Sequence, residues 1–119
     1  MMDDVKDYPP YLDYPLKRPR SDLTELDKLE AYLKAKGIRY WRNDEQVHVG
    51  QYIVDLHQIA VLDEYGRPSW DAICQTGSYG YEEGLLGVMG KPVVRKSDGD
   101  DVVGWLTAAD VIARLEGAP

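Results

Sequence analysis

Hydrophobic positions recur at spacings of three and four residues in the segment 22–36, which predicts an amphipathic helix there. Asp22 and Glu25 predict a capping box at its start, because an acidic side chain at each position can accept a hydrogen bond from a backbone amide of the first turn. Ser21 is the competing cap. Gly37 is the expected left-handed residue at the end of the helix. The apolar positions are Leu23, Leu26, Leu29 and Leu33.

Short segments with alternating or continuous apolar residues follow this helix and predict strands. The pair Asn43 and Asp44 is expected to form a turn, and Gly50 marks a bulge or a break where the alternation shifts phase. Residues 63–68 predict a hairpin turn. The predicted strands are 38–42, 46–54, 57–62 and 70–75.

The last of these strands leads into a glycine-rich elbow and a predicted middle helix over residues 79–89. On such a helix, Gly80, Gly84 and Gly87 would form a bare stripe. Glycine inside a helix costs about 1 kcal/mol relative to alanine. The stripe therefore predicts close packing, either against the protein's own sheet or against another chain.

The C-terminal part contains a possible short strand at 93–94, an extended segment at 102–106 and a last helix. Thr107 and Asp110 have the spacing of a capping box for that helix. Consecutive strands with tight connections favour an antiparallel sheet, and helices are expected to cover one of its faces. The sequence therefore predicts an α+β fold with a sheet of about four strands and N-terminal, middle and C-terminal helices.

The sequence predicts that residues 1–20, which are rich in tyrosine and proline, form an extended arm before a single domain over 21–119. Its prolines disfavour a helix and favour polyproline II, which has three residues per turn. Tyr8, Tyr11 and Tyr14 recur every third residue and would line one edge of the arm. This pattern predicts that the arm docks on its own domain or on a partner, and a disordered leader is the alternative.

The net charge of −7 is concentrated in residues 43–90, where Arg67 is the only lysine or arginine. A surface of this sign repels nucleic acid and attracts basic partners. Simple solvation of an acidic face is the alternative. The carboxylates in this segment are Asp44, Glu45, Asp55, Asp63, Glu64, Asp71, Glu82 and Glu83.

The sequence contains no recognised catalytic, metal-binding or cofactor-binding motif. The elbow at 77–80 lacks the spacing of a phosphate-binding loop, and the carboxylates that follow it would repel phosphate. Cys74 and His57 are the only possible thiol and imidazole pair, with Asp55 or Asp71 as a third group, but a cysteine within a strand is more typical of a core. His48, His57 and Asp55 lack metal-ligand spacing.

A single cysteine excludes a disulfide within the chain and is typical of a reducing cytosol. No run approaches the length of a membrane span, and the N-terminal residues show no apolar signal region. We therefore expect a cytoplasmic protein.

Four short motifs within residues 56–115 resemble small uncharacterised proteins of bacterial mobile elements and prophages. They are the strand W-D-A-I-C, the elbow G-S-Y-G, the G-L-L segment and the terminal W-L-T-A. The resemblance implies no active site.

Together, these observations predict a non-catalytic protein-binding module. One concrete form is an anti-defence inhibitor of the anti-CRISPR type, whose carboxylates imitate phosphates and occupy a basic nucleic-acid channel of its partner. The alternatives are a small hydrolase or transferase that uses Cys74 and His57, and an accessory protein that forms a homodimer through its glycines.

Overall fold

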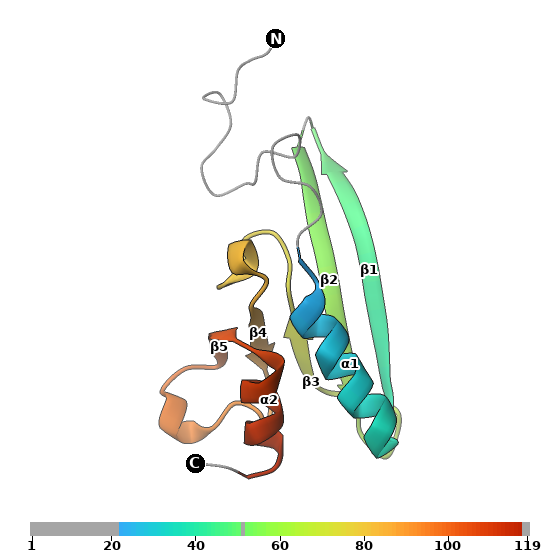
Figure 1. The fold of residues 1–119 in the computed structure, drawn as a ribbon, viewed down its shortest axis with the longest axis vertical. Coiled ribbons are helices and arrows are strands. Elements are labelled where there is room, and N and C mark those ends of the chain that lie inside the picture. Colours follow the sequence, from blue (N-terminus) through green and yellow to red (C-terminus); the bar gives the residue numbers. More distant parts are fainter. Residues whose placement is uncertain (1–21, 51, 118–119) are drawn as a thin grey trace.

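A computed structural model describes residues 22–50 and 52–117 and confirms the α+β class. Five strands form one antiparallel sheet in the order of the sequence, one strand more than predicted, and two helices lie against one face of it (Figure 1). The strands are β1 (Tyr40–Val49), β2 (Tyr52–Leu62), β3 (Pro68–Ile73), β4 (Leu86–Met89) and β5 (Val102–Leu106). The helices are α1 (Thr24–Lys36) and α2 (Ala108–Leu115), with the short 3₁₀ turns η2 (Tyr81–Glu83) and η3 (Lys96–Asp98).

The N-terminal arm at 1–20 and its tyrosines Tyr8, Tyr11 and Tyr14 lie outside the described residues. No helix in the described part of the chain is long and apolar enough to cross a membrane.

Helix α1 buries the apolar face that its leucine spacing predicts, and α2 buries Ala108 and Val111. Helix α1 ends at Gly37 as expected, but its predicted capping box is absent. Instead, Glu25 accepts a hydrogen bond of 2.7 Å from the backbone amide of Ala108, the first residue of α2. Glu25 thus satisfies an amide at the start of the other helix and links the two helices. The predicted capping box of Thr107 and Asp110 is confirmed at α2.

Strand β1 continues through Asn43 and Asp44, so the predicted turn at these residues is wrong. The turn between β1 and β2 lies at Gly50 instead. Polar residues are tolerated within β1 because it is an edge strand whose side chains find partners nearby. Asn43 donates a hydrogen bond to Glu45, and Arg42 donates to Asp44. The predicted hairpin at 63–68 is confirmed between β2 and β3.

The predicted middle helix at 79–89 is wrong, because the chain forms only the turn η2 and then strand β4. Gly80 and Gly84 flank η2 with φ angles of 89° and 73°, in the left-handed region, so the helical turn cannot extend. A Cβ on Gly80 would lie 2.8 Å from Cβ of Leu85, and one on Gly84 would lie 3.0 Å from the Asp22 carbonyl oxygen. Gly87 lies in β4 with ordinary packing distances, and the three glycines therefore do not form one stripe.

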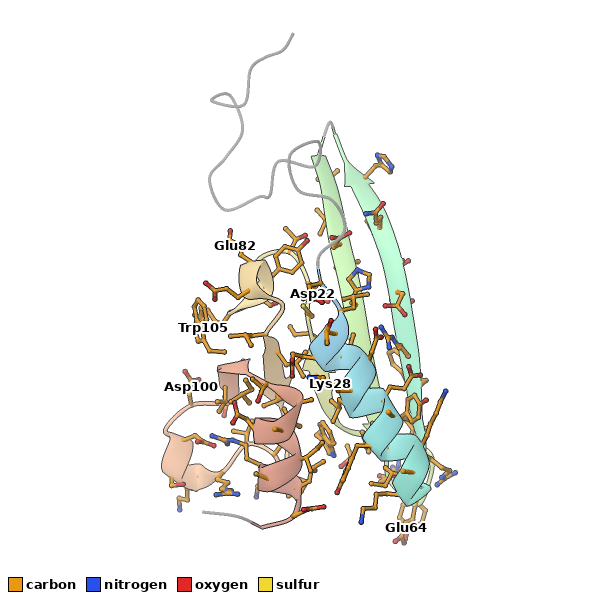
Figure 2. The ribbon with its side chains drawn as sticks, viewed as in Figure 1. Asp22, Lys28, Glu64, Glu82, Asp100 and Trp105 are labelled. Atoms are coloured by element: carbon orange, nitrogen blue, oxygen red, sulfur yellow. The ribbon has the colours of Figure 1, made fainter. Side chains whose placement is uncertain are left out.

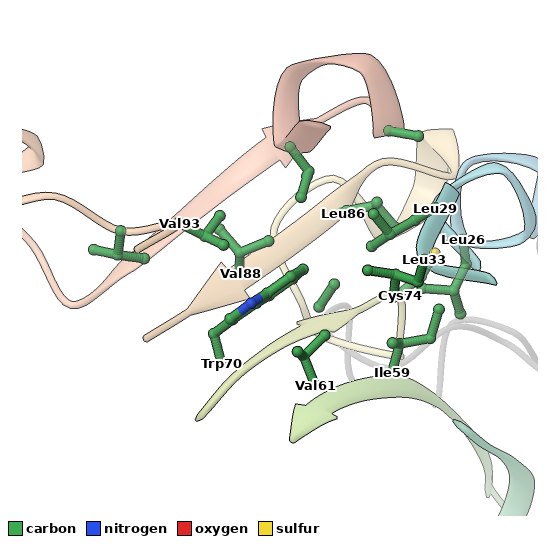
Figure 3. Packing of buried hydrophobic residues seen from close by; sticks show 14 of the residues in the cluster. Leu26, Leu29, Leu33, Ile59, Val61, Trp70, Cys74, Leu86, Val88 and Val93 are labelled. Carbon is green, nitrogen blue, oxygen red and sulfur yellow. The ribbon is translucent and has the colours of Figure 1, made fainter. Parts of the chain in front are cut away.

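The hydrophobic core lies between the two helices and the covered face of the sheet (Figure 3). Trp70, Ala72 and Cys74 all face this core, as their alternation predicts. Val93 and Val94 are buried as well, but they lie in a turn and not in the predicted short strand. The core is therefore one-sided, and in the described chain both helices pack on the same face of the sheet.

Candidate functional site

The face of the sheet turned away from the helices is a candidate site, and we call it the open face. Its centre is a row of residues that are direct neighbours across four strands: Trp41, Ala60, Asp71 and Met89. Trp41 is 42% exposed and Met89 is 51% exposed, whereas Ala60 between them is buried. The row therefore exposes the apolar side chains of Trp41 and Met89, with the buried Ala60 between them.

A hollow of about 330 Å³ lies at this row and is lined by Trp41, Ala60, Asp71 and Met89, together with Pro68 and Ser69. The amide of Gln58 donates a hydrogen bond of 2.6 Å to the Asp71 carboxylate, which fixes both side chains. Partial burial raises the pKa of Asp71 above its usual value, although the Gln58 hydrogen bond opposes this shift. A carboxylate held beside apolar side chains is suited to meeting a hydrogen-bond donor or a cation.

The apolar character of the open face continues along β1 and β2 beyond the hollow. Val47 and Val49 are exposed on β1, and Glu45 is an acidic exception among them. By strand register, the apolar side chains of this face are Trp41, Val47, Val49, Val54, Leu56, Ile73 and Met89. An antiparallel sheet with one solvated face normally carries polar residues there. An exposed apolar patch of this kind is typical of an interaction site.

The eight carboxylates of residues 43–90 do not share one surface. Glu64 and Glu82 lie far apart, Glu64 at the bottom right and Glu82 at the upper left of Figure 2. The carboxylates occupy four places, namely the covered side of β1 and β2 (Asp44, Asp55), the open face (Glu45, Asp71), the β2–β3 hairpin (Asp63, Glu64) and η2 (Glu82, Glu83). Asp55 is moreover buried, so a partner cannot reach it in this conformation.

Asp55 belongs to a buried polar cluster on the covered side of the sheet. Its carboxylate accepts hydrogen bonds of 2.6 Å from the Tyr81 hydroxyl and 2.7 Å from the Gln46 amide. Its backbone amide donates to the Thr76 hydroxyl. These bonds connect β2 to η2 and β1, and they offset much of the cost of burying a carboxylate. The cluster therefore positions η2 against the sheet.

His57 lies beside this cluster and is held by Asp44. Its Nδ1–H donates a hydrogen bond of 2.6 Å to the Asp44 carboxylate, which also accepts from Arg42. Burial pushes the pKa of Asp44 upward, but the hydrogen bonds from His57 and Arg42 outweigh it and hold that pKa below its usual value. Nε2 of His57 lies 4.0 Å from Asp55 and has no hydrogen-bond partner among the described residues.

Cys74 directly follows β3 and lies beside His57 of β2, the pair that the alternative of a cysteine-dependent enzyme would use. The backbone amide of Cys74 donates to the His57 carbonyl at 3.0 Å, and both side chains face the covered side. The thiol is fully buried, and Nε2 of His57 forms no hydrogen bond with it. A substrate would therefore need the core to open before it reached the sulfur. Within the described ranges, no group of three or more candidate ligands could hold a metal ion.

Sequence reasoning missed the open face because it divided β1 at Asn43 and Asp44. With the strand undivided, Trp41, Val47 and Val49 lie on the same side of β1, interrupted there by the polar residues Asn43 and Glu45. Comparisons of the chain with protein-family models, with curated proteins and with solved structures find no match.

Proposed function

We propose that the protein is a non-catalytic binding module that holds a protein partner on the open face of its sheet. The observation that carries the proposal is the apolar surface around Trp41 and Met89, which no described element covers. Exposing such side chains to water is unfavourable, and covering them with a partner recovers about 25 cal/mol for each Å² of apolar area.

The acidic excess of residues 43–90 favours a partner with a basic surface, because charges of opposite sign speed association. Glu45 and Asp71 lie on the open face itself and are suited to pair with lysine or arginine around an apolar contact. This chemistry agrees with an inhibitor that occupies a nucleic-acid-binding effector, as the resemblance to mobile-element proteins suggests. The scattered carboxylates favour contact through the open face over imitation of a continuous run of phosphates.

A photo-crosslinking amino acid placed at Met89 tests this proposal in a lysate of cells that carry the gene. The same probe at Tyr65 is the matched control, because Tyr65 is 72% exposed on the β2–β3 hairpin, away from the open face. We expect a protein adduct from Met89 that is absent from Tyr65, weakens with salt and is lost in the variant Trp41→Asp. Equal adducts at both positions, or an adduct that Trp41→Asp leaves unchanged, would contradict the proposal.

A homodimer is the other occupant that this experiment distinguishes. In that case the Met89 adduct would have twice the mass of the chain, and Trp41→Asp would convert a dimer to a monomer in sedimentation experiments. Such a result would identify the molecule bound to the open face as a second copy of the chain and not as a different protein.

The second candidate function is a cysteine-dependent hydrolase or transferase. It is favoured by one observation, the placement of Cys74 beside a histidine that Asp44 already orients. Catalysis by this group would require a thiol that reacts in the folded protein. The alkylation rate of Cys74 measures this property directly.

A further inference from the structure

The outer edge of strand β1 is unpaired in the described part of the chain. β1 is the first strand in the sheet order, so β2 is its only neighbour there, and Figure 1 shows it at the right-hand border of the sheet. Natural edge strands are commonly protected from pairing by a proline, a bulge, a cover or a short length. β1 has 10 residues without proline, and its register with β2 shows no shift.

The hydrogen-bond pattern determines which backbone groups reach this edge. The Leu62 amide donates to the Arg39 carbonyl at 2.9 Å, so these two residues form a hydrogen-bonded pair. Such pairs alternate along antiparallel strands, and every second residue of β1 therefore directs its amide and carbonyl away from β2. These residues are Tyr40, Arg42, Asp44, Gln46 and His48. No other described residue forms a backbone hydrogen bond with their outward groups.

The charged side chains of β1 do not protect the edge, because they are paired within the chain. Arg42 donates to Asp27 and Glu30 of α1, which holds its guanidinium over the covered side of the sheet. Asp44 lies on the same side and accepts hydrogen bonds from Arg42 and His57. The backbone between the side chains is thus left accessible to a further strand.

We propose that β1 pairs antiparallel with β1 of a second copy, so that the two five-stranded sheets continue as one. A two-fold axis at Asn43 gives the complementary register, because it places Arg42 of each copy opposite Asp44 of the other. About eight backbone hydrogen bonds would then join residues 40–46 of the two copies. An axis at residue 42, 44 or 45 would instead place like charges directly opposite each other, which is destabilising.

The composition of the arm at 1–20 favours a second copy over the arm as the occupant of this edge. Prolines at 9, 10, 15 and 19 lack the amide that a ladder of hydrogen bonds requires. The stretch before them contains aspartates at 3, 4 and 7, which Asp44 and Glu45 would repel. The segment 42–44 meets no such conflict with its own copy, since its charges are complementary when the strand is reversed.

This inference goes beyond the proposed function, because it concerns the edge of the sheet and not its open face. Pairing in the plane of the sheet leaves both open faces uncovered and joins them on one side. Met89 lies on β4, which β2 and β3 separate from β1. A crosslink from Met89 therefore reports a contact of the open face, whereas the experiments below report pairing at the edge.

Oxidation of the variant Asn43→Cys in a glutathione redox buffer tests the proposed register. At the two-fold axis the two Cα atoms would lie about 4.5 Å apart, within the range of a disulfide. Val47→Cys is the matched control, because Val47 is exposed on the same side of β1 but would lie about 26 Å from its counterpart. The native Cys74 is buried and should stay reduced.

We expect Asn43→Cys to form the disulfide-linked dimer at least about tenfold faster than Val47→Cys, because pairing raises the effective concentration of one thiol at the other. Equal rates for the two variants, or no dimer from either, would overturn the proposal. Both results would also follow if the arm or a strand of a different protein occupied the edge.

Sedimentation of the full chain tests the same pairing without oxidation. Asn43→Lys places two lysines opposite each other at the axis, and lysine is a common means of blocking edge pairing. Val47→Lys is the matched control on the same strand. We expect Asn43→Lys to weaken self-association about fivefold and the control to have little effect. Equal weakening by the two variants, or a parent protein that stays a monomer, would refute the inference.

Discussion

Replacing Tyr81 by phenylalanine should destabilise the protein substantially, although the change removes a single oxygen atom. The Tyr81 hydroxyl is buried and donates a hydrogen bond of 2.6 Å to the Asp55 carboxylate. Asp55 is buried as well, so water cannot readily replace the lost donor in the folded state. The variant Tyr81→Phe keeps the aromatic ring and therefore creates almost no cavity.

The magnitude follows from the loss of one buried hydrogen bond to a charged group, which is about 1.5 to 3 kcal/mol. For a domain of this size, a loss of about 2 kcal/mol lowers the melting temperature by about 10 °C. The folded protein keeps the bond from Gln46 to Asp55, so the cluster is weakened but not eliminated. We therefore expect a folded, less stable variant.

Urea unfolding followed by tryptophan fluorescence measures this effect, and the slope of the free energy of unfolding against urea should stay constant. Tyr65→Phe is the matched control, because its hydroxyl lies on an exposed hairpin residue and its loss should cost less than about 0.5 kcal/mol. If Tyr81→Phe costs no more than this control, the hydrogen bond to Asp55 contributes nothing and the reasoning is refuted.

Three further predictions test other parts of the structure. The thiol of Cys74 is fully buried, so its alkylation should be slow in the native protein and accelerate with urea, whereas a fast native reaction would support the enzyme alternative. Gly104→Ala places a methyl group against Tyr79 and should cost about 1 to 3 kcal/mol in urea unfolding, and a neutral effect would contradict the close contact. Hydrogen bonds from Arg114 lower the pKa of Asp98 to about 2. Because the folded-state pKa is depressed, this stabilisation is present above the unfolded pKa of about 4 and is lost as the pH falls toward 2. Thermal unfolding between pH 6 and pH 3 should therefore show a smaller loss of stability for Asp98→Asn than for the parent protein, and equal losses would refute this role.

Local sequence signals predicted those elements whose residues satisfy one another over short distances. The leucine spacing of α1 and the capping box of Thr107 and Asp110 depend on neighbours three or four residues away, and both were confirmed. The capping box of Asp22 and Glu25 failed because Glu25 bonds the amide of Ala108, far along the chain. A sequence pattern contains no information about that competing donor.

The predicted middle helix failed because backbone conformation outweighed spacing. Gly80 and Gly84 were interpreted as small residues on a helix, where glycine is tolerated at a cost. In the structure they adopt left-handed angles that end the turn on both sides, and the following residues pair with β3 and β5. Two glycines four residues apart are compatible with a helix and also with a short turn followed by a strand. The pairing of β4 with β3 and β5 favours the turn and strand.

The candidate site was predictable only in part. The acidic excess is evident from the sequence, but strand register determines that Glu45 and Asp71 face one side while Asp55 faces the core. Trp105 gave no signal at all, because a positive φ at a residue other than glycine cannot be read from residue type. The hollow of the open face likewise depends on residues that are distant in the sequence and meet only in the folded sheet.

The distribution of polar and apolar residues over the two faces of the sheet supports a role in binding. The covered side buries Asp55 and His57 in a network of hydrogen bonds, which is a costly use of core positions. The open side instead exposes the apolar side chains of Trp41 and Met89 to water, where an antiparallel sheet normally carries polar residues. Stability alone does not explain side chains that are unfavourable where they lie. We therefore propose that a partner covers them, while the buried network holds the sheet in shape.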